Sequence, residues 1–302
     1  MSHHHPHSHS HGHSHSPVDT ARKALWWAFL INAGFLIVEA IGGWLSGSLA
    51  LLADAGHMLS DVTALAVVLW VGYIIRKRAD AVHSYGYGRV EVLSGLLNGL
   101  MLWVISIWIA VEAWHRLQDP QEINVALMLP VAVAGLLANA GSAWMIFAHR
   151  SNDLNMRAAF LHLTADAAGS IGAILAGIGI LWKGWDWIDP AASVLIGVLI
   201  VVSSWSLIKE SVHILLEGTP TDVDLDTIRQ DLIQLDGVND CHDLHSWSVG
   251  SQEAMLSAHL LRDAGCSTSP ILDAAKGLLS EKYGIRHSTL QIEDVPCEKL
   301  HG

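Results

Sequence analysis

The sequence is poor in charged residues and in cysteine. Only 15% of its 302 residues are Asp, Glu, Lys or Arg, against about 25% in soluble domains. The formal net charge of −12 provides no basic surface that could neutralise phosphates, which argues against a nucleic-acid-binding function. Three cysteines make no disulfide framework, so nothing indicates an extracellular fold stapled by disulfides.

The chain also lacks an apolar run at its start, which excludes a secretory signal peptide. Residues 1–16 instead hold eight His that alternate with Ser, Gly and Pro. Tracts of this composition bind metal ions and lack the residues that form a packed core. An expression tag is the alternative, but tags are usually uninterrupted His runs. We therefore interpret residues 1–20 as a disordered tail that collects metal ions.

Apolar residues are abundant, at 51% of the chain, and they are unevenly spread. Residues 1–217 are only 12% charged, whereas residues 218–302 are about 24% charged. Six apolar segments precede this change, each near the roughly 20 residues that a membrane-spanning helix needs. The segments are Leu25–Leu45, Leu49–Ile75, Val90–His115, Val125–His149, Arg157–Trp182 and Pro190–His213. We predict a mainly α, six-helix transmembrane domain over residues 21–215 and a second domain over 216–302.

Basic residues in the short links predict the orientation of this multi-pass protein in the bilayer. Cytoplasmic loops are enriched in Lys and Arg. Nine Lys and Arg residues lie on the side of the N-terminus and two on the other side, which predicts that both termini are cytoplasmic. The nine are Arg22, Lys23, Arg76, Lys77, Arg78, Arg89, Arg150, Arg157 and Lys209, against Arg116 and Lys183.

The last 85 residues have the pattern of a small α+β domain. Periodicity predicts helix, strand, strand, helix and strand over 225–235, 238–249, 254–261, 270–283 and 288–292. In a regular first strand, the period of two places His242 on one face with Leu244 and Ser246, and His245 on the other. We therefore expect that His242 and His245 cannot both ligate one ion.

Two apolar segments carry the same polar motif. His57 and Asp61 lie in the second segment, and His162 and Asp166 in the fifth, both with i,i+4 spacing that puts the pair on one helix face. Ionisable groups at membrane depth are costly and indicate function. Brought face to face, the pairs supply two nitrogens and two oxygens, which suits tetrahedral Zn²⁺. The alternative is two unrelated polar pairs, each hydrogen-bonded within the bundle.

Four protein ligands favour carriage of the ion over catalysis. A catalytic zinc normally keeps one position open, and no HExxH motif occurs in the sequence. We therefore expect no enzyme. Ligand imidazoles must be neutral and ligand carboxylates ionised, so metal and protons compete for the site, which predicts a Zn²⁺/H⁺ antiporter. The alternative is a metal-responsive membrane sensor or scaffold that binds zinc without moving it.

Three more acids lie in apolar stretches, and the sequence leaves their roles open. Asp54 precedes His57 by one turn and either orients its imidazole or serves as a cap or a solvated loop residue. Glu39 and Glu112 are either proton sites or interfacial residues.

Several motifs together resemble one protein family. These are SGSLALLADAGHMLSD (46–61), HSYGYGRVEVLSG (83–95), the HxxxD of 162–166, LLEGTP (215–220), HDLHSWS (242–248) and LQIED (290–294). The chain is thereby similar to the zinc-exporting bacterial branch of the cation diffusion facilitators. The resemblance implies a homodimeric inner-membrane exporter with a metallochaperone-like cytoplasmic domain, which exchanges Zn²⁺ for H⁺ by alternating access. It assigns the transport site to His57, Asp61, His162 and Asp166.

The same resemblance implies further functional positions in the link between the second and third segments. Asp80 and His83 match ligands of a loop metal site, although Tyr87 stands where some members have a third ligand, His. A polar cytoplasmic loop is the alternative. Arg89 and Glu217 match an ion pair at the dimer interface of similar proteins.

In the C-terminal domain the resemblance favours His242, His259 and Glu293 as a regulatory zinc site. Gln291 stands where the family often has His, which puts a second ion in doubt, and Cys297 is near enough in sequence to contribute a thiolate. A strand position without a ligand role is the alternative for His259.

Overall fold

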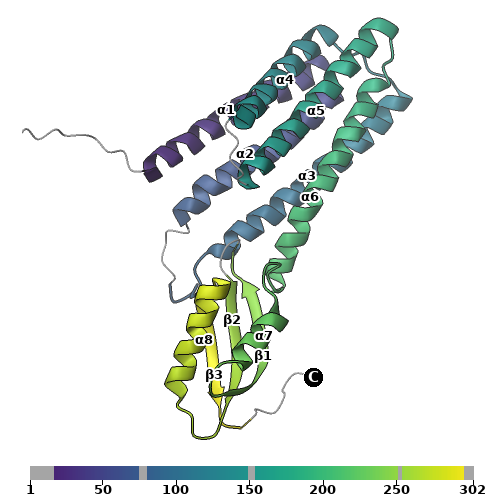
Figure 1. The fold of residues 1–302 in the computed structure, drawn as a ribbon. Coiled ribbons are helices and arrows are strands. Elements are labelled where there is room, and N and C mark those ends of the chain that lie inside the picture. The colour runs from purple at the N-terminus through teal and green to yellow at the C-terminus, as the bar shows by residue number, and fades with distance from the viewer. Residues whose placement is uncertain (1–16, 75–79, 149–153, 251–253, 296–302) are drawn as a thin grey trace, which may run out of the picture.

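A computed structural model describes the backbone of residues 17–74, 80–148, 154–250 and 254–295. The side chains of 17–25, 68, 71–74, 141–143, 145–148, 154–165 and 168 lie outside its description. Six long helices form one part of the molecule, and a small α+β domain forms the other (Figure 1). The six helices are α1 (Pro17–Ser46), α2 (Leu49–Ile74), α3 (Gly88–Gln118), α4 (Val125–Ala148), α5 (Leu154–Lys183) and α6 (Ile188–Leu215).

The helices pack as a bundle in which α2 is central. It contacts α1, α3, α5 and α6, while α4 packs on α1 and α5, and α3 packs along α6. Glycine permits close approaches: a Cβ on Gly99 of α3 would lie 2.6 Å from Ile208 of α6, and one on Gly56 of α2 would lie 2.7 Å from Ile105 of α3. Small residues that bring helix backbones together are typical of membrane bundles.

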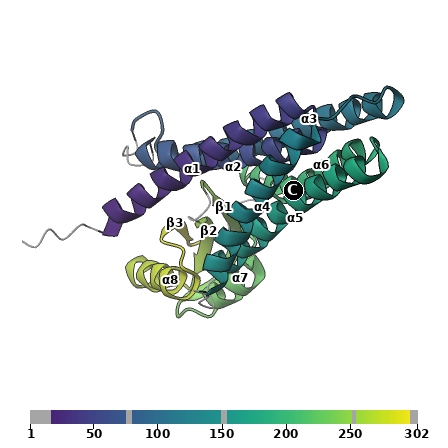
Figure 2. The same cartoon turned by 90° about the horizontal axis from the view of Figure 1, so that it is seen from above.

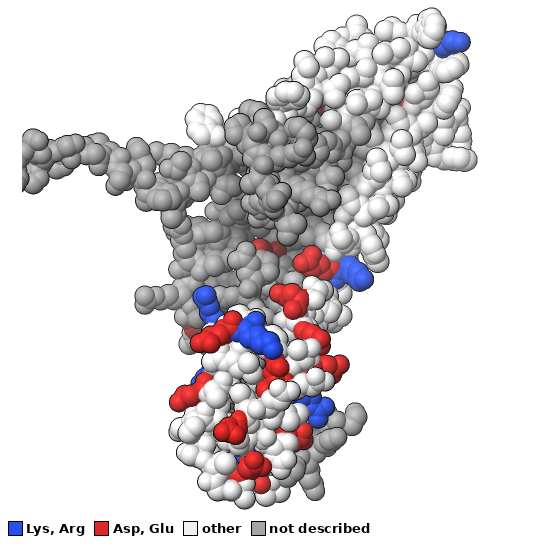
Figure 3. All heavy atoms as spheres, in the orientation of Figure 1, with Lys and Arg blue, Asp and Glu red and all other residues white. Residues whose placement is uncertain are grey.

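The outer surface of the bundle is apolar, as a bilayer requires. Large side chains such as Trp44, Leu97 and Trp182 are more than 60% exposed. On the face seen in Figure 3, charged side chains gather over the C-terminal domain, and the described part of the bundle shows few. In the described residues, four helices are long and apolar enough to cross a membrane, and two shorter apolar stretches lie in α4 and α5. The predicted mainly α architecture is confirmed.

Trp103 lies in the middle of α3, away from the interfacial positions that tryptophan prefers. Its ring stacks on Trp205 of α6 with centroids 5.6 Å apart, and its Nε1 donates to Ser204 Oγ at 3.1 Å. The stacking and the hydrogen bond join α3 to α6, so packing accounts for this mid-span tryptophan.

The C-terminal domain is a three-stranded sheet covered on one face by two helices (Figures 1 and 2). Its elements are α7 (Leu225–Ile233), β1 (Val238–Ser248), β2 (Ala254–Arg262), α8 (Thr268–Tyr283) and β3 (His287–Glu293). β2 is central, antiparallel to β1 and parallel to β3. Asp224 caps α7 by accepting from the backbone N–H of Asp226 at 3.1 Å, and Gly284 ends α8 in a left-handed conformation. The predicted order of elements is confirmed.

One prediction about β1 is wrong because the strand is not regular. Asp243 has φ of +48° and forms a bulge, so that His242 pairs with His259 but His245 pairs with Ser257. The extra residue reverses the alternation. His242 and His245 therefore share the sheet face that α7 and α8 leave open, while Cys241 and Leu244 contact the core on the other face.

Candidate functional site

The two HxxxD motifs lie on adjacent helices of the bundle. His57 and Asp61 are on α2, Asp166 is on α5, and these two helices are in contact. His57 Nε2 lies 3.0 Å from Asp166 Oδ1. One ligand atom from each of the three residues lies within 4.8 Å of the other two, which is close enough for one metal ion.

Of these three residues inside the helical bundle, Asp166 is buried, and His57 and Asp61 are partly buried. The side chains of His57 and Asp166 are 18% and 9% exposed. Placing a carboxylate there is costly unless it is paired or binds a cation. One imidazole nitrogen and two carboxylate oxygens are a donor set that accepts Zn²⁺.

His162 precedes Asp166 by four residues within α5. The helical period places the two residues on one face of the helix. The side chain of His162 lies outside the described residues, so its ligand role stays a prediction. We refer to His57, Asp61, His162 and Asp166 as the quartet.

A second set of polar side chains is buried beside the quartet. Glu39 of α1 is 1% exposed, Asp54 of α2 is 4% exposed and Ser170 of α5 is fully buried. Ser170 Oγ donates to Asp54 Oδ2 at 3.4 Å. We call Glu39, Asp54 and Ser170 the buried acidic cluster. A solvated-loop role for Asp54 and an interfacial role for Glu39 are therefore wrong, whereas Glu112 forms a partly exposed ion pair with Arg116 at 2.9 Å.

Asp189 is a structurally important residue that sequence reasoning missed. It lies in the first turn of α6, fully buried, and its carboxylate accepts hydrogen bonds from the start of α2. The donors are Ser48 Oγ at 2.6 Å, Leu49 N at 2.7 Å and Ala50 N at 3.3 Å. A carboxylate at a helix N-terminus satisfies orphan N–H groups and interacts favourably with the helix dipole. The available signal was an acid at the start of an apolar segment.

The predicted loop residues lie together in the connection between α2 and α3. Asp80 Oδ1 accepts from the N–H of His83 at 2.6 Å and of Val82 at 2.9 Å, and Oδ2 accepts from the Tyr87 hydroxyl at 2.8 Å. The His83 N–H and the Tyr87 hydroxyl lower the pKa of Asp80 to about 2. His83 Nδ1 lies 3.4 Å from Asp80 Oδ1. Both carboxylate oxygens already accept protein hydrogen bonds, so this geometry stabilises a turn.

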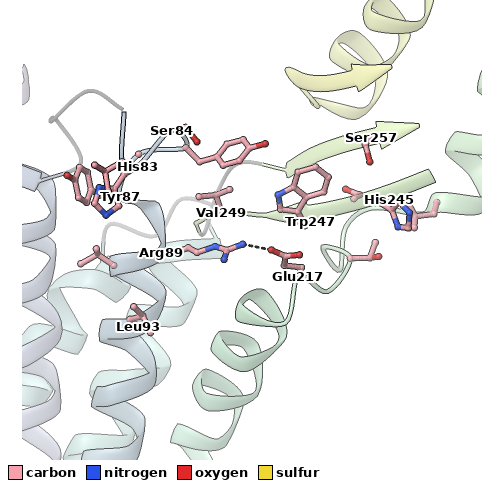
Figure 4. A pocket seen from close by; sticks show the side chains of 17 residues that line it. His83, Ser84, Tyr87, Arg89, Leu93, Glu217, His245, Trp247, Val249 and Ser257 are labelled. Atoms are coloured by element: carbon pink, nitrogen blue, oxygen red, sulfur yellow. Dashed lines mark hydrogen bonds and ion pairs between the residues drawn. The ribbon is translucent and has the colours of Figure 1, made fainter. Parts of the chain in front are cut away.

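Arg89 and Glu217 form an ion pair within one chain, with Nη2 and Oε1 2.8 Å apart. The pair joins the start of α3 to the segment after α6, and Glu217 has a positive φ of 58°. It borders a pocket of about 960 Å³ between the α2–α3 connection and the sheet, where Trp247 and His245 also lie (Figure 4). Both charges are exposed, at 43% and 63%. An exposed pair adds little stability, so its effect is mainly on the position of the C-terminal domain.

The third predicted group lies on the open face of the sheet. Glu293 Oε2 is 3.2 Å from His242 Nε2, and Glu293 Oε1 is 3.0 Å from His259 Nδ1. Ligand atoms of these three residues lie within 4.8 Å of one another, and Glu293 is buried. Gln291 donates to Glu293 Oε1 at 2.6 Å, so it orients that carboxylate. Cys297 lies outside the described residues.

Comparison with known proteins bears on both parts of the chain. The family model of the cation efflux transmembrane domain matches residues 25–216, and that of the cation efflux protein cytoplasmic domain matches residues 220–295. The solved metal-bound C-terminal domain of the CzcD transporter from Cupriavidus metallidurans is 33% identical, with a TM-score of 0.23, and the match covers 24% of this chain and 99% of that one.

Three curated proteins are similar over nearly the whole chain. The metal cation efflux system protein CzcD of Cupriavidus metallidurans is 39% identical over 90% of this chain and 86% of its own length. The zinc transporter ZitB of Escherichia coli is 40% identical over 93% and 90%. The cadmium, cobalt and zinc/H⁺–K⁺ antiporter of Bacillus subtilis is 40% identical over 90% and 89%. The chain therefore belongs to the cation efflux family, that is, the cation diffusion facilitators, and is a multi-pass membrane transporter of metal cations rather than an enzyme.

Proposed function

We propose that the protein exports Zn²⁺ from the cytoplasm in exchange for protons, by exposing the quartet alternately to the two sides of the inner membrane. The observation that carries the proposal is the juxtaposition of His57, Asp61 and Asp166 within the bundle. Their ligand atoms come from two separate helices. Relative movement of α2 and α5 would therefore change the geometry of the site and also the side of the membrane to which the site is open.

The donor set supports zinc as the ion that is transported. Imidazole nitrogen suits Zn²⁺ better than Mg²⁺ or Ca²⁺, which prefer oxygen ligands. With His162 as the fourth ligand, the site would have two nitrogens and two oxygens in reach of a tetrahedral ion. The names of two relatives support the same choice, since one is a zinc transporter and another carries cadmium, cobalt and zinc.

Competition for the same lone pairs supports coupling to protons. His57 Nε2 and Asp166 Oδ1 are 3.0 Å apart, a separation at which one proton can be shared. A metal ion bound to both atoms would displace that proton. The name of the Bacillus subtilis relative includes H⁺ as a counter-ion.

The proposed orientation places both termini in the cytoplasm, and the proposed assembly is a homodimer. The excess of Lys and Arg on the side of the N-terminus supports the orientation. The Arg89–Glu217 pair at the junction of the two domains is suited to hold each C-terminal domain against its bundle at the dimer interface.

We further propose that His242, His259 and Glu293 hold a regulatory zinc ion. Residues 218–302 carry 14 acids and 6 bases, so two such domains repel each other. A bound cation would offset part of this charge and bring the domains together. The domain has a core of its own, so small-angle scattering of residues 216–302 can test this: a scattering profile that zinc leaves unchanged contradicts the regulatory role.

The N-terminal tail is proposed as a low-affinity collector of metal ions. The eight His of residues 1–16 lie outside the described residues. Deletion of residues 2–16 is expected to leave zinc transport measurable, and complete loss of transport contradicts this role.

Zinc flux in proteoliposomes with an imposed proton gradient tests the main proposal. Asp61→Asn and Asp166→Asn keep the shape of each side chain but remove its charge, and both are expected to reduce gradient-driven flux to background. Asp186→Asn, in the exposed connection between α5 and α6, is the matched control and should transport like the native protein. Zinc binding without flux in the native protein contradicts transport and favours a sensor or scaffold.

A further inference from the structure

The buried acidic cluster adjoins the quartet and lies on its side away from the C-terminal domain. Asp54 precedes His57 on α2, and Ser170 follows Asp166 on α5. Asp54 is therefore nearer than His57 to the start of α2, and Ser170 is nearer than Asp166 to the end of α5. The start of α2 and the end of α5 lie at one end of the bundle, and α6 leads into the C-terminal domain at the opposite end (Figure 1). Three or four residues along a helix correspond to about 4.5–6 Å.

Oxygen atoms from three helices converge at this level of the bundle. A Cβ built on Gly135 of α4 would lie 2.8 Å from Glu39 Oε1 and 3.2 Å from Ser170 Oγ. A Cβ on Gly169 of α5 would lie 3.0 Å from Asp54 Oδ1. Larger residues at these two glycines would occupy the space that the oxygens face.

Glu39 points to a ligand more directly than the rest of the cluster. Its side chain is 99% buried, and its Oε2 has no hydrogen-bond partner among the described residues. In the described part of the chain, no Lys or Arg forms an ion pair with Glu39 or Asp54. Two buried carboxyl groups that lack a Lys or Arg partner among the described residues require a cation or protons.

We propose that Glu39, Asp54 and Ser170 form a second, weaker cation site, through which the transported metal ion leaves the quartet on the side away from the C-terminal domain. The inference rests on the proposed export of Zn²⁺. The cluster offers only oxygen donors, which bind Zn²⁺ less strongly than imidazole does. A weak site next to a strong one is what release requires, because an ion must bind well enough to enter and weakly enough to leave.

Zinc uptake by the purified full-length protein tests the site without requiring transport. The Asp61→Asn protein has a weakened quartet, so the remaining weak uptake reports the cluster, and all variants share the tail and the cytoplasmic site. Adding Glu39→Gln is expected to remove one weakly bound zinc per protomer, with at least a tenfold loss of affinity. Adding Glu112→Gln instead, an acid in another apolar stretch, should leave uptake unchanged. Equal uptake with and without Glu39→Gln overturns the site and means that the cluster holds protons only.

Zinc flux in proteoliposomes tests whether the site lies on the transport route. Glu39→Gln alone is expected to lower flux at least tenfold, whereas Glu39→Asp, which keeps the carboxylate, should retain at least a third. Glu112→Gln should stay within twofold of the native protein. Native flux in Glu39→Gln overturns the route.

A second variant covers the case in which Glu39→Gln does not fold. Gly135→Ala adds a methyl group where the oxygens of Glu39 and Ser170 converge, and it is expected to lower both weak uptake and flux at least fivefold. Gly172→Ala, with no atom within 4 Å of the added Cβ, is its control. If the native protein shows no flux, proposed export fails, while the uptake difference at Glu39 still decides whether the cation site exists.

Discussion

Replacement of Asp189 should detach the start of α2 from α6. The carboxylate accepts from Ser48 Oγ, Leu49 N and Ala50 N at 2.6, 2.7 and 3.3 Å. In Asp189→Ala the Ser48 hydroxyl can turn to other acceptors, but the two backbone N–H groups stay buried, since Leu49 and Ala50 are fully buried. The substitution therefore leaves two donors unsatisfied at the N-terminus of the helix that carries His57 and Asp61.

The expected loss of stability follows from those two donors. A buried donor without a partner costs about 1–3 kcal/mol, so Asp189→Ala should cost about 4 kcal/mol in the free energy of unfolding. At about 2–4 °C per kcal/mol for a chain of this size, the Tm should fall by about 10 °C. Asp189→Asn keeps one acceptor oxygen and should cost about 1–2 kcal/mol, the range of a weakened helix cap.

Thermal unfolding of the purified protein in detergent measures this difference, and zinc flux in proteoliposomes measures its effect on transport. Asp186→Ala is the matched control, because Asp186 is exposed in the same connection and a surface change costs within about 0.5 kcal/mol. The order of stability should be native and Asp186→Ala, then Asp189→Asn, then Asp189→Ala. A Tm for Asp189→Ala within about 1 °C of native refutes the reasoning.

Three further predictions concern packing and ionisation. Gly99→Ala should lower the free energy of unfolding by about 1–3 kcal/mol, because the α3–α6 contact has no room for a methyl group. Gly172→Ala, which has open space around the added methyl group, is the control. In the same denaturation assay its free energy of unfolding should lie within about 0.5 kcal/mol of the native value. Burial raises the pKa of Cys241 to about 11, so an alkylating reagent at pH 8 should modify partly exposed Cys266 but not Cys241, as mass spectrometry would show. Because this pKa is raised, the protonated Cys241 thiol contributes stability below its ordinary pKa of 9.0, and this contribution is lost as the pH rises through about 11. Denaturation of the native protein and of Cys241→Ala at pH 8 and pH 11 measures the loss. Asp80 has a lowered pKa of about 2, so the stability that its carboxylate contributes to the turn is present above its ordinary pKa of 3.8 and lost as the pH falls through about 2. An NMR titration of Asp80 with a midpoint near 4 contradicts the observed hydrogen bonds.

Much of the fold could be predicted from local patterns. Hydropathy and length identify the six helices, because a spanning helix must satisfy its backbone internally and expose apolar side chains to lipid. The i,i+4 spacing of His57 and Asp61 placed both on one helix face. The elements of the C-terminal domain follow from their periods and turns, with ends that differ by at most two residues from those observed.

Backbone conformation limited the prediction in β1. Alternation in a strand depends on every residue being extended, and Asp243 instead has φ of +48°. Nothing in the sequence around Asp243 marks it as a bulge, so the alternating pattern predicts the wrong face for His245. The pairing of His242 with His259, which brings both imidazoles to Glu293, depends on the same register.

The membrane-spanning architecture and the residue types of the proposed metal ligands follow from the sequence, since both depend on hydropathy and spacing within single helices. Which groups meet depends instead on tertiary packing: His57 with Asp166, Asp189 with Ser48 at a separation of 141 residues, and Glu39 with Asp54 and Ser170. These contacts depend on how helices pack side by side, which is set by many small steric fits, such as those at Gly99 and Gly135, rather than by any periodic signal within one helix.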